Sequence, residues 1–443
     1  MKKWLIALIL ALPSLALAED KLDTGDTAWM MISTALVLLM TPAGLALFYG
    51  GMTRSKNVLN TYAMVFGAFV VAFIAWIVAG YSMAFANGGS LNGFMGGFSN
   101  VFLTESKWTD LSSMGAFPEY VFVVFQGTFA AITVAIASGS VIERMKFSTW
   151  MVFVAIWTIA VYAPIVHMVW GGGLLFDAGA LDFAGGTVVH MNGGLAGLVL
   201  AFLVGKRTGY PKIAMKPMSV MLTALGAALL WFGWYGFNGG SAFGANAIAG
   251  LAYLTTTLAT AVAAVTWILI EWFVYKKPTL LGAASGVVAG LVAITPAAGF
   301  VDVTGSIIIG VVGSAFAFYG VAVLKKKLGY DDSLDAFGIH FLAGLWGALA
   351  TGFLAVKDVD LLWDGPLKTS LLPDAVAAGV QPDVMGQFLV QLQSVAVVGT
   401  FTLIGTVVVY YIASALTGGG RVDEETEQIG LDETIHGERS LNI

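Results

Sequence analysis

Long apolar stretches alternate with short polar segments along almost the whole chain. Eleven of these stretches reach the roughly 17 residues that a helix needs to cross a hydrocarbon layer. In such a layer, a single segment pairs all of its backbone groups only when it is helical. The pattern therefore predicts an all-α polytopic membrane protein. Its eleven transmembrane helices are expected near residues 28–50, 58–86, 118–140, 148–166, 184–204, 217–239, 245–274, 279–296, 303–324, 334–355 and 388–416.

The first 18 residues carry a different pattern. Lys2 and Lys3 precede a short apolar run over 4–12, and residues 16–18 read Ala-Leu-Ala before two acidic residues. Such a sequence is typical of a cleaved secretory signal. A first transmembrane helix is the alternative, but the run is shorter than the ~20 residues of a span. The chain is thus expected to contain a signal peptide (1–18), a transmembrane domain (19–416) and a C-terminal tail (417–443).

Lys and Arg are distributed unequally between the two sets of loops. One set, together with the tail, carries 15 of them, and the other set carries four. Loops rich in Lys and Arg stay on the cytoplasmic side. We therefore expect a protein of the cytoplasmic (inner) membrane, with the mature N-terminus outside and the C-terminus in the cytoplasm. The larger set is Arg54, Lys56, Arg144, Lys146, Lys206, Arg207, Lys212, Lys216, Lys276, Lys277, Lys325, Lys326, Lys327, Arg421 and Arg439, and the smaller is Lys21, Lys107, Lys357 and Lys368.

The composition excludes several classes of protein. Of the 443 residues, 58% are hydrophobic and only 11% are charged, whereas an ordinary soluble domain has about 25% charged residues. A disordered chain needs the opposite balance. The net charge of −6 argues against a nucleic-acid partner, because phosphate contacts need clustered Lys and Arg. The chain has no cysteine, so it has no disulfide, thiolate metal site or cysteine nucleophile.

Two of the predicted spans share a motif. The segments that begin at His190 and His340 both fit the pattern H-x-x-small-G-L-x-G. They belong to the fifth and tenth spans, which cross the membrane in opposite directions. Such a relation is the mark of an inverted repeat, which is common in transporters. We therefore expect a five-plus-five inverted repeat with an extra C-terminal helix.

The same two histidines are the first candidates for chemistry. Ionisable side chains within spans are rare and usually face a cavity or a partner. The alternative is that the two rings are unrelated and each is satisfied by a backbone carbonyl. Counting residues from the span ends, at ~1.5 Å per residue, places His190 and His340 at depths that differ by almost 10 Å. A third histidine, His167, is expected at the outer end of the fourth span.

Aromatic and hydroxyl side chains collect in the outer half of the predicted bundle. Phe125 and Phe129 share one helix face at i, i+4, Trp170 follows the fourth span, and residues 231–241 are rich in Trp, Phe and Gly. An interfacial aromatic belt is one interpretation, and an aromatic cage for a small cation is the other. Asp182 is placed to cap the start of the fifth span and to lower the cost of a nearby cation.

Several of these segments together resemble the ammonium transporter (Amt) family. The resemblance runs from about residue 24 to the end and is strongest at 167–173, 181–190, 231–241 and 337–340. It implies a homotrimer with one pore per subunit that transports ammonium, is not an enzyme and needs no cofactor. It also implies roles for nine residues: Phe125, Trp170 and Ser241 at an outer ammonium-recruitment site; Phe129 and Phe237 as stacked gate rings; His190 and His340 as a hydrogen-bonded pair that relays protons; Trp234 as a pore-lining ring; and Asp182 as a mainly structural acid near the outer site.

Physical chemistry then indicates a mechanism. A bare cation in the centre of a bilayer costs several kcal/mol or more, so ammonium is expected to lose its proton before neutral ammonia passes the apolar section. We expect the overall transport to be electrogenic. Three alternatives stay open: an ammonium sensor with little transport, a redox protein with His190 and His340 as haem ligands, and a pore for another small solute.

The tail suggests a second function. Three glycines at 418–420 precede the acidic residues Asp423, Glu424, Glu425 and Glu427. Charge alone predicts a solvated acidic tail. The family resemblance instead implies a regulatory tail that packs on the cytoplasmic face, couples the subunits and takes part in control by a PII-type signalling protein.

Overall fold

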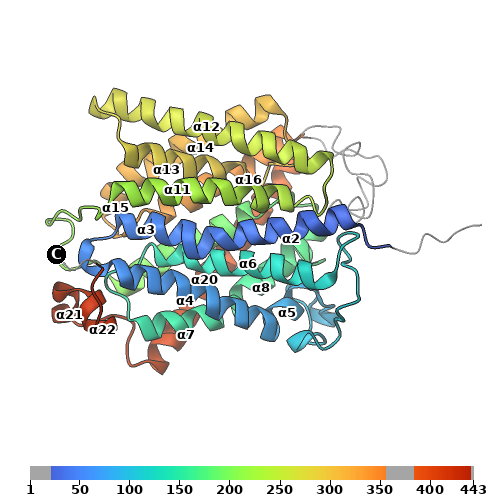
Figure 1. The fold of residues 1–443 in the computed structure, drawn as a ribbon, viewed down its shortest axis with the longest axis horizontal. Coiled ribbons are helices and arrows are strands. Elements are labelled where there is room, and N and C mark those ends of the chain that lie inside the picture. The colour runs from blue at the N-terminus through green and yellow to red at the C-terminus, as the bar shows by residue number, and fades with distance from the viewer. Residues whose placement is uncertain (1–20, 356–383, 441–443) are drawn as a thin grey trace, which may run out of the picture.

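The computed structural model describes residues 21–355 and 384–440, so the predicted signal peptide lies outside the described residues. Within these residues, ten helical segments are long and apolar enough to cross a membrane, and the 15-residue helix α13 (Leu280–Ile294) is a shorter apolar one. Together they account for the eleven predicted spans. The long helices run side by side along one shared direction (Figure 1). No β-strand occurs in the described part of the chain.

Short π- or 3₁₀-helical turns, labelled η, interrupt many of the spans. The first five spans comprise α2 (Thr24–Leu39), η1 (Met40–Leu45) and α3 (Ala46–Met52); η2 (Ser55–Asn57), α4 (Val58–Ala75), η3 (Trp76–Gly80) and α5 (Tyr81–Phe85); α6 (Glu119–Ser138); α7 (Phe147–Trp157), η6 (Thr158–Tyr162), α8 (Ala163–Trp170) and α9 (Leu174–Asp177); η7 (Gly186–Met191) and α10 (Asn192–Val204). Two further turns, η4 (Gly89–Leu91) and η5 (Val101–Leu103), lie in the loop after α5.

The later spans comprise α11 (Val220–Trp234) and η8 (Tyr235–Gly239); α12 (Ala247–Tyr275); α13; α14 (Val303–Tyr319), η9 (Gly320–Leu324) and α15 (Lys325–Leu328); η10 (Phe337–Phe341) and α16 (Leu342–Leu354); and α20 (Val384–Leu416). The tail forms α21 (Glu424–Ile429) and α22 (Leu431–His436). Both intramembrane histidines lie in π-helical turns, His190 in η7 and His340 in η10. Such turns are frequent at functional sites.

The fourth span ends later than its sequence pattern suggested. The expected boundary was residue 166, with His167 at the outer face and Trp170 in the following loop. Instead α8 continues to Trp170, because the apolar run continues to that residue and the helix stops only at Gly171. His167 is fully buried, and its Nδ1 and Nε2 lie 2.9 Å from Ala84 O and 2.7 Å from Asn92 O.

The two helices that carry the intramembrane histidines, η7 with α10 and η10 with α16, begin in the same way, and we call them the pore helices because of the resemblance noted above. Asp182 precedes His190 by eight residues, and Asp332 precedes His340 by the same distance. The Asp182 carboxylate accepts hydrogen bonds from backbone amides at the start of η7, including Gly186 N at 2.6 Å. The Asp332 carboxylate accepts them at the start of η10, including Phe337 N at 2.8 Å. The repeat therefore extends beyond the histidine motif to the way each helix starts.

The two pore helices run in opposite directions. The buried Arg144 guanidinium donates from Nε to Gly205 O, directly after α10, at 2.6 Å. It also donates from Nη2 to Asp331 O, shortly before η10, at 2.7 Å. Helix α10 thus ends where the second pore helix begins. This antiparallel relation agrees with the predicted inverted repeat.

Both pore helices begin inside the bundle rather than at its surface. The segment before η7 pairs with the end of the eighth span, where Phe183 N donates to Pro296 O at 3.1 Å. The segment before η10 pairs with the end of the third span, where Leu334 N donates to Gly139 O at 2.9 Å. Non-helical backbone is tolerated at membrane depth only where protein or a cavity surrounds it. Each helix therefore places its histidine, His190 or His340, in the middle of the bundle within its first two turns.

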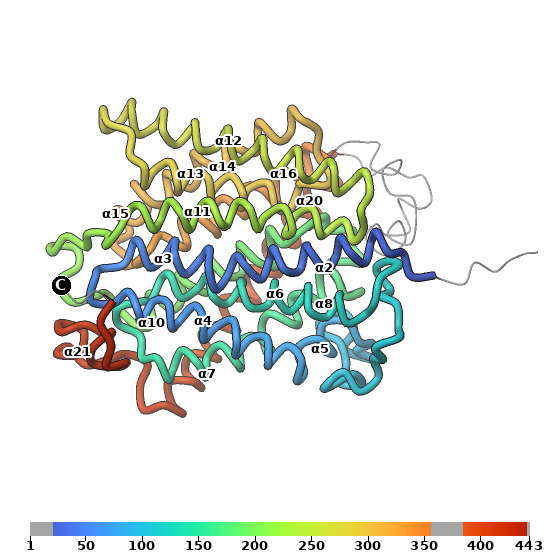
Figure 2. Tube along the Cα trace, in the orientation of Figure 1, coloured from blue at the N-terminus to red at the C-terminus, as the bar shows by residue number. Residues whose placement is uncertain are grey.

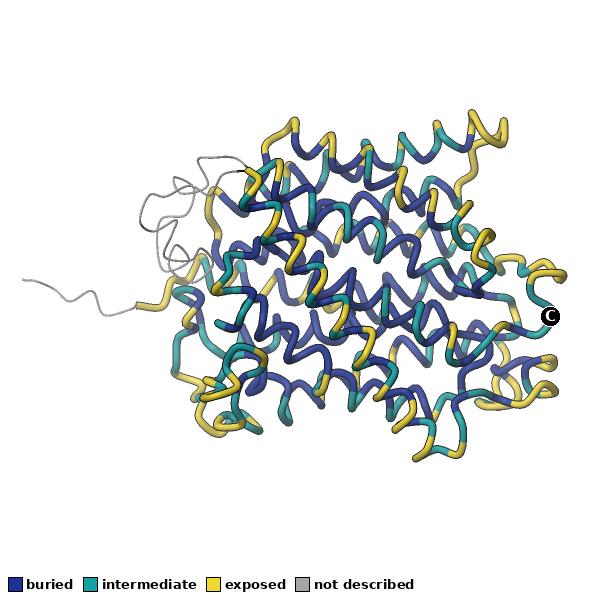
Figure 3. The backbone as a smooth tube through the Cα atoms, turned by 180° about the vertical axis from the view of Figure 1, so that it is seen from behind, coloured by how far each residue is buried: buried dark blue, intermediate teal, exposed yellow. Residues whose placement is uncertain are grey.

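Exposed residues are frequent in the loops at the two ends of the bundle, and they also occur along the outer helices (Figure 3). We call the end that carries α21 and α22 the C-terminal end and the opposite end, where α2 begins, the N-terminal end (Figure 2). The basic loops that contain Arg54, Arg144, Arg207 and Arg421 meet at the C-terminal end, as the charge pattern predicted. That this end faces the cytoplasm stays a prediction.

A buried ion-pair cluster closes the C-terminal end. Arg207 contacts Glu143 at 3.1 Å and Asp331 at 2.7 Å, and Arg54 contacts Glu143 at 2.6 Å. Burial alone would raise the pKa of Glu143, but Arg207 and Arg54 hold it below its usual value. The pKa of Asp331 is also lowered, because hydrogen bonds and charge from Arg207 outweigh burial. The cluster is therefore fully charged at neutral pH.

Candidate functional site: an aromatic pocket above a histidine pair

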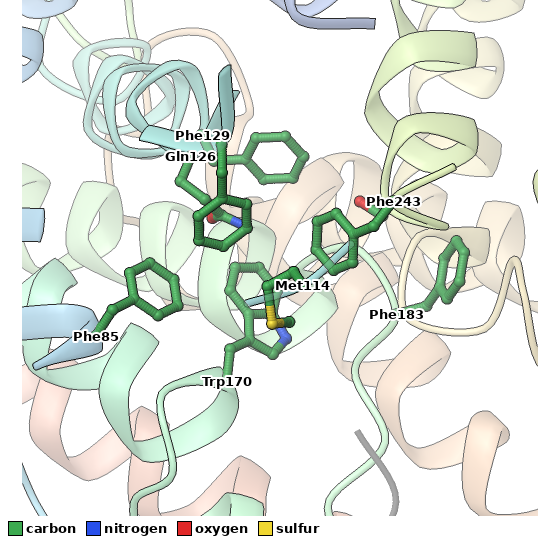
Figure 4. A pocket seen from close by; sticks show the side chains of 9 residues that line it. Phe85, Met114, Gln126, Phe129, Trp170, Phe183 and Phe243 are labelled. Atoms are coloured by element: carbon green, nitrogen blue, oxygen red, sulfur yellow. The ribbon is translucent and has the colours of Figure 1, made fainter. Parts of the chain in front are cut away.

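A pocket lies among the aromatic side chains near the N-terminal end of the bundle (Figure 4). It leaves ≈ 10 Å³ for the centre of a water-sized molecule, which is about what one such molecule needs. The pocket is lined by Phe85, Met114, Phe122, Gln126, Phe129, Trp170, Phe183, Ser241 and Phe243.

The structure brings two of the three predicted recruitment residues to this pocket. Trp170 and Ser241 line it, whereas Phe125 lies next to the lining, with its ring centroid 4.8 Å from that of Phe129. One hydrogen bond fixes the Trp170 indole, because its Nε1 donates to Asp182 O at 2.8 Å. Ser241 Oγ donates to Phe237 O at 2.8 Å, so its lone pairs are available to accept a hydrogen bond from a ligand.

Sequence reasoning missed the most polar part of the lining. Gln126 is buried, and its Oε1 has no hydrogen-bond partner in the part of the chain that the structure describes. A buried acceptor without a partner costs about 1–3 kcal/mol, so a ligand that donates hydrogen bonds is favoured here. The signal was present, since Gln126 is the one amide between Phe125 and Phe129 in an apolar helix.

Other missed residues had no such signal. Met114 and Phe243 reach the pocket from non-helical segments on either side of long spans. Figure 4 shows both side chains among those that line the pocket. Their positions depend on tertiary packing, which no local pattern encodes.

Two stacked rings close the pocket towards the middle of the bundle. Phe129 of α6 and Phe237 of η8 have ring centroids 4.1 Å apart and planes inclined by 14°. Both rings are buried. Phe129 also lines the pocket, and Phe237 lies 5.8 Å from the His190 ring on the other side. The two predicted gate residues thus separate the pocket from the histidines.

The two imidazoles are in direct contact. His190 Nδ1 lies 3.3 Å from His340 Nδ1, and the ring centroids are 5.4 Å apart. The 10 Å offset in depth that residue counting suggested is therefore wrong, because both pore helices begin inside the bundle. Two nitrogens at this distance share one hydrogen, so one ring donates and the other accepts. His190 Nε2 is buried and has no partner among the described residues.

Glycines at equivalent positions of the two repeats permit this approach. A Cβ on Gly194 would lie 2.6 Å from Phe341 N, and a Cβ on Gly344 would lie 3.2 Å from His190 Cβ. The first distance is shorter than real Cβ contacts, and the second is tighter than most of them. Small residues in these helices thus allow the close helix contact that brings the imidazoles together.

Trp234 completes the wall around the first imidazole. Its ring stacks on His190 at 5.2 Å with an angle of 19°, and its Nε1 donates to Thr295 Oγ1 at 2.9 Å. The predicted pore-lining tryptophan therefore lies between Phe237, at 5.3 Å, and the histidine pair. Aromatic rings therefore flank the His190 imidazole on this side.

Asp182 supports the site from outside the pocket. Its carboxylate accepts five hydrogen bonds, four from the backbone amides of residues 185–188 and one from Thr187 Oγ1. Burial raises the pKa of Asp182, and the hydrogen bonds from Thr187 and the backbone oppose that shift. The expected cap of the fifth span is thus present. Asp182 does not line the pocket and reaches it only through its carbonyl group and Trp170.

Comparison with known proteins identifies the family. The model of the Ammonium Transporter Family matches residues 28–441. The chain belongs to the ammonium transporter family. An ammonium transporter from Aquifex aeolicus (strain VF5) is 47% identical over 430 residues, which cover 96% of this chain and 95% of that protein.

Solved structures with the same fold extend this comparison within the ammonium transporter family. The crystal structure of Saccharomyces cerevisiae Mep2 matches with a TM-score of 0.82 and 34% identity, over 91% of this chain and 89% of that chain. A structure described as a sensor Amt protein matches with a TM-score of 0.80 and 26% identity, over 92% and 97% of the two chains. The all-helical membrane fold and the family resemblance seen in the sequence are both confirmed.

As a member of the ammonium transporter family, the protein is not expected to use its histidines as haem ligands, and the geometry agrees. The His190 and His340 rings are stacked at 21° with their centroids 5.4 Å apart. A haem needs its two axial ligands on opposite faces of the macrocycle. Rings in direct contact leave no space for a macrocycle between them.

Proposed function

We propose that the protein recruits ammonium in the aromatic pocket, removes its proton, and conducts ammonia past the histidine pair. One observation carries this proposal: the pocket, the stacked phenyl rings and the two imidazoles form a continuous series. Phe129 belongs to both the pocket and the ring stack, and Phe237 adjoins both the stack and His190. Among the described residues, Gln126 Oε1 lies at the pocket end of this series, and the imidazole nitrogens of the histidine pair lie at the other end.

The pocket favours ammonium through its rings and its acceptors. The rings of Trp170 and Phe129 offer faces to a cation, and each cation–π contact is worth about 0.5–2 kcal/mol. Gln126 Oε1 and Ser241 Oγ are available to accept hydrogen bonds from ammonium. An alkali cation of the same charge has no N–H groups to donate. The combination of rings and acceptors therefore supports ammonium over sodium or potassium.

The section below the pocket favours a neutral solute. It is bounded by Phe129, Phe237 and Trp234, and no salt bridge of the described residues lies there. A cation without carboxylates or carbonyl rings costs several kcal/mol in such a place. His190 Nε2, which lacks a partner in the described part of the chain, is placed to exchange a hydrogen bond with ammonia. We therefore place deprotonation above the phenyl stack.

The proton released there is proposed to cross as well, so that transport is electrogenic. An imidazole nitrogen can accept or donate a proton, and the shared hydrogen between the two Nδ1 atoms offers a route. The test is the current evoked by an ammonium pulse in proteoliposomes that contain the purified protein. A current that scales with ammonium supports the proposal. Uptake of ammonium without current would overturn the electrogenic part and leave ammonia conduction.

A sensor with little transport is the second candidate. The likeness to the structure described as a sensor Amt protein favours it, whereas the closer sequence similarity to the Aquifex aeolicus ammonium transporter favours transport. Growth on limiting ammonium of a strain that lacks its own transporters distinguishes the two. Rescue of growth by this protein supports transport, and ligand binding without rescue would support sensing.

The same proposal includes the setting of the protein. We place it in the inner membrane as a homotrimer, with the pocket outside, the C-terminal end in the cytoplasm, and a PII-type protein as the regulatory partner. The tail supports this regulatory role, because it is folded onto the bundle: Glu427 accepts from Thr208 N at 2.6 Å, and Leu431 N donates to Asn57 Oδ1 at 2.8 Å. A PII-type protein that docks here would therefore contact both the tail and the loops that close the C-terminal end.

A further inference from the structure

Helix α20 lies outside both repeats, yet one of its side chains contacts both of them. Gln391 is 1% exposed. Its Oε1 accepts a hydrogen bond from Leu181 N at 2.7 Å, and its Nε2 donates to Leu181 O at 2.7 Å and to Ala348 O at 2.8 Å. Gln387 Nε2 donates to the same Oε1 at 3.3 Å. The two donors and two acceptor positions of the amide are thus all used.

The first target of Gln391 leads to the pocket. Leu181 immediately precedes Asp182, and its N–H and C=O are both paired with Gln391. This two-way pairing fixes the backbone as a neighbouring β-strand would. Asp182 O then accepts the hydrogen bond that holds Trp170 Nε1 at 2.8 Å. Two consecutive residues therefore connect the Gln391 amide to the indole that lines the pocket.

The second target leads to the histidine pair. Ala348 lies on α16, eight residues after His340 and on the same span. Leu181 belongs to the repeat that carries His190, and Ala348 belongs to the repeat that carries His340. One amide therefore fixes the lateral position of the two pore helices relative to each other near the N-terminal end.

We propose that Gln391 is a positioning residue that sets the Trp170 ring in the pocket and aligns the two pore helices; this inference rests on the proposed function. The eleventh helix thus acts on the pore and is more than a brace for the bundle. An apolar side chain cannot replace the amide, because it would leave Leu181 N, Leu181 O and Ala348 O with unpaired buried positions.

The test compares Gln391→Leu with Ser394→Ala in full-length protein reconstituted in proteoliposomes. Ser394 is a matched control, because it is also 1% exposed, lies three residues further along α20, and its Oγ has no partner in the described part of the chain. The readouts are the half-saturating ammonium concentration, the maximal current and the amount of folded protein. We expect Gln391→Leu to raise the half-saturating concentration about threefold to tenfold, which matches the loss of part of a cation–π contact. Ser394→Ala should leave it unchanged.

A merely structural role gives a different result. It lowers the maximal current in proportion to the folded protein and leaves the half-saturating concentration unchanged, and that result would overturn the inference. A Trp170→Ala background sharpens the test, because Gln391→Leu should add no further rise once the ring is absent. A wild-type protein without ammonium-dependent transport would instead overturn the proposed function itself.

Gln391→Glu covers the case in which the leucine variant fails to fold. The carboxylate keeps the shape and the acceptor for Leu181 N, but it cannot donate to Leu181 O or Ala348 O unless it is protonated. The rise in half-saturating concentration relative to the wild type should therefore shrink as the pH is lowered. The inference is contradicted if the half-saturating concentration of the variant, divided by that of the wild type, is the same at all pH values or is equal to one.

Discussion

Each of the two pore helices starts with an aspartate that accepts hydrogen bonds from backbone amides, but the charged residues around the two aspartates differ. Asp182 is held by five neutral donors, and no Lys or Arg among the described residues forms an ion pair with it. Asp332 adjoins Asp331, which is paired with Arg207, and Asp335, which is paired with Lys325. An inverted repeat thus gives the two ends a common geometry but not a common electrostatic potential.

This difference separates the tasks of the two ends. At the N-terminal end, the carboxylate stands behind an aromatic pocket and adds negative potential without a competing cation. At the C-terminal end, the basic side chains already neutralise the carboxylates, so a second cation gains little there. In the proposed mechanism, a symmetric backbone with asymmetric charges is therefore suited to attract ammonium from one side only.

The largest expected effect tests the histidine pair, to which both repeats contribute. Either His190→Ala or His340→Ala removes one partner of the single hydrogen bond between the rings. We expect each variant to lower the ammonium-dependent current about a hundredfold, the scale of a lost acid–base group. The double variant should lose little more, because the two rings act as one unit. Currents that fall independently for the two sites would show that the imidazoles act separately.

The next effect tests the feature in which the two repeats differ, namely the charges around the aspartate at the start of each pore helix. Asp182→Ala should raise the half-saturating ammonium concentration about tenfold, or about 1.4 kcal/mol, because it removes the charge behind the pocket and the anchor of Trp170. Asp332→Ala should lower the maximal current with a smaller change in half-saturation. Equal kinetic effects of the two substitutions would remove the proposed division of tasks.

Asp302→Ala provides a matched control for both aspartates. Asp302 caps α14 by accepting a hydrogen bond from Gly305 N at 2.7 Å, but it is exposed and distant from the pore helices in sequence. Loss of such a cap costs about 1 kcal/mol of stability. The variant should therefore lower the unfolding temperature without changing the half-saturating ammonium concentration.

Much of the fold was predictable because the spans are continuous apolar runs. The pattern placed all eleven spans, and the positions of most ends were right to within a few residues; for example, the tenth span was expected at 334–355 and is found at Phe337–Leu354. The largest error was the end of the fourth span, which was expected at residue 166 and lies at Asp177 when α9 is included. The glycines at 171–173 interrupt the apolar pattern between α8 and α9, so hydropathy alone ended the span too early.

The candidate site was predictable only where a motif carried it. The family resemblance supplied Trp170, Ser241 and the histidines, and the structure brings them into one series. Residue counting failed for the depth of His190, because it assumes that helices begin at the membrane surface. Gln391 could not be found from the sequence, since its partners are backbone groups about 40 and 210 residues away.

A smaller effect concerns the ion pairs at the C-terminal end. The pKa of Glu143 is lowered in the folded protein, so its ionisation stabilises the fold above the unfolded value of 4.5 and this stability is lost as the pH falls through the lower folded value. Glu143→Gln should lower the free energy of unfolding by about 1 kcal/mol at neutral pH, because Arg207 keeps Asp331. Its stability should also fall less than that of the wild type below about pH 4.5. Thermal unfolding measured from pH 3 to 7 checks both; parallel curves for the two proteins would rule out this role.

The smallest expected effect concerns the tail. Deletion of residues 418–443 removes the partners of Thr208 and Asn57 at the C-terminal end, together with the pairing of Val422 N with Arg144 O at 3.0 Å. Arg144 also holds the start of the second pore helix through Asp331 O, whereas the aromatic pocket has no contact with the tail. We therefore expect the maximal current to fall about twofold, a coupling of roughly 0.4 kcal/mol, with unchanged half-saturation. Arg439→Ala, which breaks only the exposed pair with Glu433, is the control and should behave as the wild type. A deletion that alters half-saturation but not maximal current would place the influence of the tail at the pocket and contradict the separation between the two ends.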